Sequence, residues 1–220
     1  MALVGLVHTT RLVIDSLHSI VAEQCPGNEF NHVMDEGILR KLSELKTITP
    51  EIVQWLTNMV HSAETTGADL AVVSCSSLSP CVNEVRKRVG IPVLKVDEPM
   101  VEHAVLNASR IGLVMTNPTT EAPSKLLFKE VCQRLKSPAT LETRLCSNAF
   151  SMLNQGDIQG HDAEVIKTVN DLLNDVEIVM LAQISIARVR KLMNPQICKR
   201  VLSSLDFIGP KINSILATNQ

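Results

Sequence analysis

Apolar residues along the chain alternate between two patterns. Short continuous runs such as Leu3–Val7, Leu70–Val73 and Ile111–Met115 have strand length and are apolar enough to be buried. Between them, in segments such as Arg11–Ala22 and His161–Leu173, apolar residues recur every three or four positions, as on one face of a helix. Alternation of strands and helices predicts an α/β protein in which each parallel sheet is covered by helices on both faces.

The same pattern gives the expected elements. The expected strands are Leu3–Val7, Glu29–Met34, Leu70–Val73, Ile91–Val96, Ile111–Met115, Thr140–Leu145 and Val176–Ala182. The expected helices are Arg11–Ala22, Gly37–Leu45, Pro50 to Gly67, Pro80 to Gly90, a helix from Glu98, a helix ending near Arg134, His161–Leu173, Ser185–Met193 and Pro210–Leu216. Thr49-Pro50 and Ser79-Pro80 each read as an N-cap followed by proline at the first helical position, and Asp97 as the cap of the helix from Glu98.

Two stretches recur at almost the same spacing. Gly5–Thr10, "GLVHTT", resembles Gly112–Asn117, "GLVMTN", at an offset of 112 − 5 = 107. The segment "VVSCSSLSP" aligns with "VMLAQISIA" so that Cys75 falls on Gln183, at 183 − 75 = 108. The shared offset indicates an internal duplication. We therefore expect two pseudo-symmetric lobes: residues 1–97, with 204–220 packing back on them, and residues 98–203.

Four loops then follow strand ends, where open α/β sheets bind ligands. They contain His8-Thr9-Thr10, Cys75-Ser76-Ser77, residues 116–120 and Gln183-Ile184-Ser185. With helix N-terminal amides behind them, small hydroxyl side chains suit a carboxylate or another small anion. The same residues also serve commonly as helix caps, so each one has an ordinary structural alternative. We expect the active site in the cleft between the two lobes.

Composition narrows the choice of partners. The chain of 220 residues has a net charge of −2, and aromatic residues make up 2%. Without a basic patch or aromatic platforms we expect no nucleic-acid partner. No apolar run approaches the roughly 20 residues that span a bilayer, and the N-terminus resembles a first strand rather than a signal peptide, so no membrane partner is expected. The six cysteines contain no C-x-x-C pair, which favours reduced thiols in a cytoplasmic protein and no metal site.

Cys75 differs from the other cysteines in its setting. It stands between a buried strand and an expected helix N-terminus, where a thiol should have a lowered pKa and form a thiolate. The alternative is a small buried hydrophobe, which is the common fate of a free cysteine. His8, at the end of the first strand, could shuttle protons or be a hydrogen-bonded structural residue. His161-Asp162 could place an acid–base group, although capping by Asp162 is the simpler interpretation.

At this point the chain resembles the aspartate/glutamate racemase superfamily. The resemblance covers nearly the whole chain and rests on the order and spacing of "GLVHTT", "VVSCSSLSP", "IPVLKVDEPMVEHAV", "RIGLVMTNPTTEAPSKLLFKEV" and "EIVMLAQISIARV". It implies two α/β lobes and an active site that works without pyridoxal phosphate, another cofactor or a metal. In typical members, one cysteine from each lobe flanks the substrate α-carbon, and loop hydroxyls and amides hold the carboxylate.

Carried over by position, Cys75 matches the first-lobe cysteine. Thr116, Asn117, Thr119 and Thr120 match the carboxylate-holding loop. Gln183 stands where the second cysteine would be, and an amide cannot act as a proton-transfer base.

The leading hypothesis is a cofactor-independent isomerase of the racemase type that acts at the α-carbon of a small carboxylate or amino acid, with Cys75 transferring the proton. The expected substrate-binding residues are His8, Thr9, Ser76, Ser77, Thr116, Asn117, Thr119, Thr120, Gln183 and Ser185. Two alternatives stay open: a single-thiol decarboxylase or lyase of malonate-like substrates, and a non-catalytic carboxylate-binding protein. Assembly as a homo-oligomer is possible.

Overall fold

The structure is a computed structural model that describes residues 1–218, and within them all side chains except those of Phe150 and Asn154. The chain divides into two compact units. Unit 1 comprises Met1–Asp97 and Phe207–Gln220, and unit 2 comprises Glu98–Asp206. Residues 219–220 of the expected C-terminal segment lie outside the described residues.

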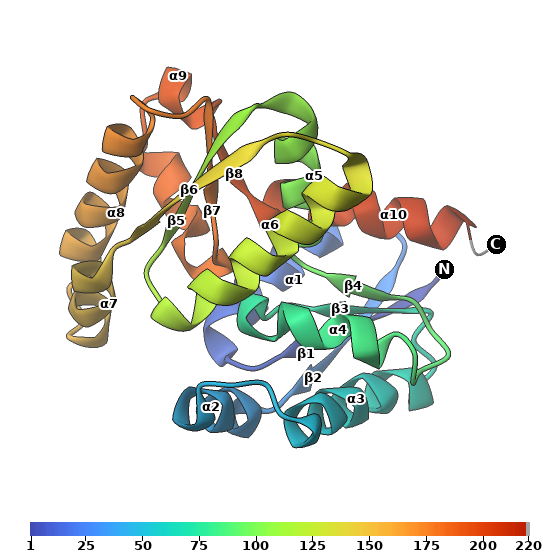
Figure 1. Cartoon of the computed structure of the whole chain (residues 1–220). Coiled ribbons are helices and arrows are strands. Elements are labelled where there is room, and N and C mark those ends of the chain that lie inside the picture. Colours follow the sequence, from blue (N-terminus) through green and yellow to red (C-terminus); the bar gives the residue numbers. More distant parts are fainter. Residues whose placement is uncertain (219–220) are drawn as a thin grey trace. The chain divides into compact units, whose positions relative to one another are not determined.

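Unit 1 is built on a parallel four-stranded sheet in the order β2-β1-β3-β4. Its strands are β1 (Leu3–His8), β2 (Glu29–Met34), β3 (Leu70–Val73) and β4 (Val93–Lys95). Its helices are α1 (Ile14–Gln24), α2 (Glu36–Leu45), α3 (Pro50–Thr65), α4 (Ser79–Val85) and α10 (Ile208–Thr218), with short 3-10 helices η1 (Arg11–Val13) and η2 (Ser76–Leu78). In Figure 1, α2 and α3 lie on one side of this sheet.

Unit 2 repeats this plan with the strand order β6-β5-β7-β8. Its strands are β5 (Arg110–Met115), β6 (Thr140–Leu145), β7 (Ile178–Leu181) and β8 (Val201–Ser203). Its helices are α5 (Glu98–Asn107), α6 (Glu121–Leu135), α7 (Ser147–Asn154), α8 (Ile158–Leu172) and α9 (Pro195–Cys198), with 3-10 helices η3 (Pro118–Thr120), η4 (Ile184–Leu192) and η5 (Ser204–Asp206). In Figure 1, α8 lies on one side of this sheet and α6 on the other.

The two units are copies of one design. Helices α3 and α8 begin 158 − 50 = 108 residues apart, strands β3 and β7 begin 178 − 70 = 108 apart, and β4 and β8 begin 201 − 93 = 108 apart. The predicted α/β fold with two parallel-sheet lobes is therefore confirmed. No helix within residues 1–218 combines the length and apolarity that a bilayer crossing needs.

Each sheet has its own core, because the apolar stripe of a helix packs on the buried strand residues. In unit 1, Val7 and Val73 pack with Leu56 and Val60 of α3. In unit 2, Val114 and Leu181 pack in the same way with residues of α8. Burial at about 25 cal/mol per Å² of apolar surface is the main stabilising contribution in both cores.

Equivalent glycines allow these helices to approach the central strands. A Cβ on Gly5 of β1 would lie 2.5 Å from the Ala63 Cβ of α3, and one on Gly112 of β5 would lie 2.6 Å from Leu172 Cδ2 of α8. The "GLV" found twice in the sequence is thus the place where strand and helix come closest in each unit.

Of the two N-caps expected before prolines, at Thr49 and Ser79, the structure shows only the first. Thr49 is the N-cap of α3, and its hydroxyl accepts a hydrogen bond from the Ile52 amide. Ser79 does not cap α4, because its hydroxyl donates instead to Asp97 Oδ1 at 2.9 Å. The helix expected over Ser185–Met193 is the 3-10 helix η4, in which buried Ile186 and Val189 stand three residues apart, the period of that geometry.

Candidate active site

Cys75 and Thr9 lie at the carboxyl ends of neighbouring strands in unit 1. Side chains alternate between the two faces of a strand, so Thr9 continues the face of Val7, and Cys75 continues that of Val73. Both valines belong to the core under α3 and α4, and Cys75 packs against the same core. Because β1 and β3 are neighbours in the sheet, the Thr9 and Cys75 loops lie side by side at this edge of unit 1.

The expected lowering of the Cys75 pKa is wrong. Burial raises the pKa of the thiol, and the nearby Asp97 carboxylate raises it further. The nearby Thr9 hydroxyl and the Leu78 and Ser77 amides lower the pKa, but they do not offset burial. The sequence showed the helix start but could not show the burial that raises the pKa of the thiol.

Two of the serines after Cys75 hydrogen-bond a buried carboxylate. Ser76 and Ser79 both hydrogen-bond Asp97, whose pKa is raised by burial in spite of these bonds and of nearby Lys95. Asp97 and Lys95 are 4% and 2% exposed, so two ionisable groups are buried beside the Cys75 loop. Sequence reasoning assigned Asp97 only a capping role. Ser77, in the same loop as Cys75, is also buried.

His8 points to the opposite face of the sheet from Cys75. Its ring Nδ1 lies 3.0 Å from Ser74 Oγ, and its Nε2 lies 3.0 Å from His32 Nδ1. His32 Nε2 in turn lies 3.1 Å from His18 Nδ1 of α1. Burial and the charge of His32 lower the pKa of His8 to about 4, so the ring is neutral near pH 7. The structure thus places His8 in a line of three histidines rather than beside the thiol.

The ring nitrogen that carries the proton in each of the three histidines can be assigned starting from Ser74, which contacts His8. The Ser74 hydroxyl donates to the Val7 carbonyl, so it can only accept from His8 Nδ1–H. His8 Nε2 must then accept from His32 Nδ1–H, and His32 Nε2 from His18 Nδ1–H. Sequence reasoning missed His18 and His32, because their pairing depends on the packing of α1 against β2.

Gln183 occupies in unit 2 the position of Cys75 in unit 1. Its Oε1 accepts hydrogen bonds from the Thr116 amide at 2.8 Å, the Thr116 hydroxyl at 3.2 Å and the Asn117 amide at 3.3 Å. A flipped side chain would set its NH₂ against three donors, so the amide orientation is fixed. Its side-chain nitrogen makes no hydrogen bond to the described residues, and it is the group left for a ligand.

In the rest of the unit 2 loop, several polar groups hydrogen-bond one another. The Thr119 amide and hydroxyl both donate to Asn117 Oδ1, at 3.0 and 2.8 Å. Thr120 is buried at the end of η3, and the Ser185 carbonyl accepts from Arg188. The structure brings Thr116, Asn117 and Gln183 together as expected, and it also shows that several of their polar groups already bond one another.

His161 and Asp162 form a further cluster in unit 2. The expected capping by Asp162 is wrong, since Asp157 caps α8 by accepting from the Gly160 amide. Asp162 instead binds the His161 ring and the Arg188 guanidinium. Arg188 had no role in the sequence reasoning, because nothing in the sequence marks a pair that stands 26 residues apart.

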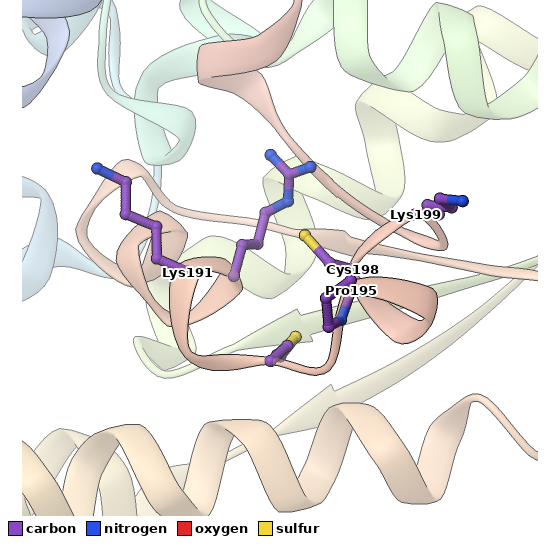
Figure 2. A pocket seen from close by; sticks show the side chains of 6 residues that line it. Lys191, Pro195, Cys198 and Lys199 are labelled. Carbon is purple, nitrogen blue, oxygen red and sulfur yellow. The ribbon is translucent and has the colours of Figure 1, made fainter.

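A surface pocket of about 370 Å³ in unit 2 does not involve these loops. It is lined by Arg190, Lys191, Met193, Pro195, Cys198 and Lys199. Figure 2 shows Lys191 and Lys199 extending in different directions, so their charges do not converge on one ligand. Among the described residues, no group of three or more His, Cys, Asp or Glu side chains is placed to hold a metal ion.

Comparison with known proteins identifies the class to which this fold and these loops belong. The sequence profile of the Asp/Glu/Hydantoin racemase family matches residues 5–208, and the chain belongs to this family. No match is found among curated proteins by sequence.

Solved structures with the same fold are racemases of several kinds. Glutamate racemase RacE1 from Bacillus anthracis matches with a TM-score of 0.75 at 15% identity, over 99% of this chain and 82% of that one. Allantoin racemase from Klebsiella pneumoniae matches with a TM-score of 0.72 at 13% identity, over 100% and 89%. Aspartate racemase from Picrophilus torridus matches with a TM-score of 0.72 at 11% identity, over 98% and 94%.

Proposed function

We propose that this racemase-type enzyme acts at the α-carbon of a small carboxylate or amino acid and that Cys75 carries the proton. The observation that carries the proposal is the setting of the thiol: it stands just past the carboxyl end of β3, where the nearby Thr9 hydroxyl and the Ser77 and Leu78 amides lower its pKa and so favour the thiolate. These donors stabilise the thiolate that forms during the reaction.

The raised pKa of the Cys75 thiol is compatible with this role. An α-hydrogen next to a carboxylate is a very weak acid, so a base of high pKa removes it more readily than a base of low pKa. The reacting form is the thiolate, the minor form of the thiol: its sulfur takes the α-proton and becomes Sγ–H, the electron pair of the broken C–H bond moves into the carboxylate to form an enediolate, and Sγ–H returns the proton to carbon and is again a thiolate. Hydroxyl and amide groups of the loops stabilise the developing charge.

Gln183 cannot serve as a proton-transfer group in unit 2. Its amide cannot exchange protons with carbon, and its oxygen is engaged by Thr116 and Asn117. In our proposal Gln183 does not act as a second proton-transfer group, and Cys75 alone removes and returns the proton on one face.

The experiment is proton wash-in from deuterated water. We expect purified protein to exchange the α-hydrogen of at least one member of a panel of amino acids, small carboxylates and hydantoins, as followed by proton NMR. Cys75→Ser should abolish the exchange, because a serine hydroxyl is far too weakly acidic to be present as the anion. Cys132→Ser, a half-buried thiol of α6, is the matched control and should retain it.

Gln183 also favours a second candidate function, because its amide leaves Cys75 as the single proton-transfer group. Decarboxylation of a substituted malonate needs a single proton donor after carbon dioxide leaves, so one thiol suffices. Release of carbon dioxide from methylmalonate or phenylmalonate that depends on Cys75, without exchange in the first panel, would select this reaction. Binding of carboxylates with neither activity would instead indicate a non-catalytic binding protein.

A further inference from the structure

His161 has a buried imidazole ring, and one of its two nitrogens makes no hydrogen bond to the described residues. It lies in the first turn of α8 and is 0% exposed. Its Nδ1 is 2.7 Å from Asp162 Oδ1, while its Nε2 has no hydrogen-bond partner among the described residues. A buried polar atom left without any partner costs about 1–3 kcal/mol, so this nitrogen needs a hydrogen-bond partner from outside the described residues.

Asp162 and Arg188 fix the proton of this ring. Arg188 Nη2 and Nε donate to the two oxygens of Asp162 at 2.9 and 3.2 Å. Burial raises the pKa of Asp162, but the bonds from Arg188 and His161 outweigh it and the pKa is lowered overall. Arg188 Nη2 also lies 3.2 Å from His161 Nδ1, but Asp162 Oδ1 is closer to both groups. The carboxylate therefore accepts from Nδ1–H, and in this tautomer Nε2 carries a lone pair that accepts a hydrogen bond.

The internal duplication shows that the fold does not require a histidine here. At the offset of 108, His161 corresponds to 161 − 108 = 53, and Val53 of α3 is an ordinary core residue. Both units form the same helix on the same sheet, one with an apolar residue and one with a buried imidazole. An apolar residue thus satisfies the packing of this helix in unit 1, and the imidazole of unit 2 adds a polar group that this packing does not need.

The position of His161 along α8 places it at the edge of the sheet that bears the loops. Leu172, near the end of α8, lies against Gly112 in the first half of β5. From Leu172 back to His161 the helix rises roughly 16 Å, and from Gly112 to Thr116 the strand rises roughly 13 Å. Since Leu172 faces the early part of β5, His161 lies at the level of Thr116, just past the strand end.

His161 also lies on the same face of the sheet as the unit 2 loop residues. Val165, one turn after His161, packs with Val114 and Leu181. Alternation along the strands puts Thr116 on the face of Val114 and Gln183 on the face of Leu181. Arg188, which holds Asp162, also donates to the Ser185 carbonyl. The unused nitrogen thus belongs to the same edge as the residues expected to bind substrate.

We propose that His161 Nε2 is a substrate-binding subsite that accepts a hydrogen bond from an N–H or O–H group of the ligand. The inference rests on the proposed function and narrows its substrate class to small carboxylates that carry such a donor, as amino acids and hydroxy acids do. Asp162 and Arg188 are positioning residues, because they act on the ligand only by fixing the proton of the ring.

Matched ligands test the subsite. The probes are three sets that differ in the donor alone: aspartate, malate and succinate; glutamate, 2-hydroxyglutarate and glutarate; alanine, lactate and propionate. We expect the wild type to bind the amino or hydroxy member of at least one set on the order of tenfold more tightly than the unsubstituted acid, as measured by calorimetry. Nitrogen-15 NMR should show His161 as the Nδ1–H tautomer, with its Nε2 signal moving when that ligand binds.

Two variants separate a subsite from a packing role. His161→Val introduces the residue of the unit 1 counterpart, and it should remove the preference while raising the melting temperature. Asp162→Asn lets the new amide donate to Nδ1 and so moves the ring proton to Nε2, which should disfavour donor ligands more than succinate or its analogues.

The inference is overturned if no set shows a preference in the wild type, or if His161→Val binds with unchanged preference. Cys75→Ser distinguishes it from the proposed function, because loss of the thiol should end proton exchange and leave the binding preference intact. If a ligand preference depends on His161 but no reaction depends on Cys75, the subsite stands and the proposed function falls.

Discussion

The Cys75 thiol should be mostly protonated in the free protein, because burial raises its pKa. We expect its alkylation by iodoacetamide to be slow at pH 7 and to increase as the pH rises past the ordinary thiol range, as measured by peptide mapping. Asp97→Asn removes a negative charge that raises the pKa and should shift this profile to lower pH. Asp171→Asn, on an exposed part of α8, is the control. A profile that is flat from pH 6 to 9 would contradict the burial of the thiol.

His8 should make the stability of the protein depend on pH. Its pKa falls from 6.5 in the unfolded chain to about 4 in the folded one, through burial and the charge of His32. The unfolded chain therefore binds a proton between pH 6.5 and 4 that the folded chain does not, and this stability is present above pH 6.5 and lost as the pH falls through that window. The contribution is roughly 3 kcal/mol for a shift of this size.

Denaturant unfolding at a series of pH values measures this dependence. His8→Asn should flatten the fall in unfolding free energy between pH 6.5 and 4, whereas substitution of exposed His103 by glutamine should leave it unchanged. Equal slopes in the wild type and in His8→Asn would show that His8 is not the group that titrates. The sequence marked His8 as a residue to test, but its neighbours His18 and His32 became visible only once α1 and β2 were packed together.

At the scale of the elements, the two glycines of the repeated "GLV" should respond differently to alanine. The new Cβ of Gly5→Ala would meet the Cβ of Ala63, which cannot move without its helix, whereas that of Gly112→Ala would meet the flexible end of Leu172. We expect a loss of about 1–3 kcal/mol for Gly5→Ala and a smaller loss for Gly112→Ala. Chemical denaturation of both variants measures the difference, and a greater loss for Gly112→Ala would contradict this assignment of rigidity.

Strong local patterns predicted most elements, and weaker ones failed for physical reasons. The cap and proline at Thr49-Pro50 marked the start of α3 correctly, because both groups act locally. Ser79-Pro80 has the same form, but the buried Asp97 competes for the serine hydroxyl. Strand β8 was missed because its three residues are too few to show a period, and α7 because no cap or proline marks it.

At the scale of the whole molecule, the duplication was the most informative feature of the sequence. The offset of 107–108 predicted two sheets of the same kind, and the strand orders β2-β1-β3-β4 and β6-β5-β7-β8 confirm it. The same offset aligned Gln183 with Cys75 in the repeat, and this alignment is why we expect no proton-transferring thiol at that position of unit 2. The hydrogen bonds that engage the Gln183 oxygen could not, since they require the β5 and β7 ends to be neighbours.

The central claim is that proton transfer runs through Cys75 on one face of the substrate. In deuterated water, one enantiomer of the substrate should therefore take up deuterium at the α-carbon much faster than it inverts, as measured on one sample by NMR and chiral chromatography. Gln183→Cys, which supplies a thiol at the repeated position, should raise inversion relative to exchange. Wild-type protein that inverts both enantiomers as fast as it exchanges them, or that exchanges at a near-native rate after Cys75→Ser, would contradict the claim.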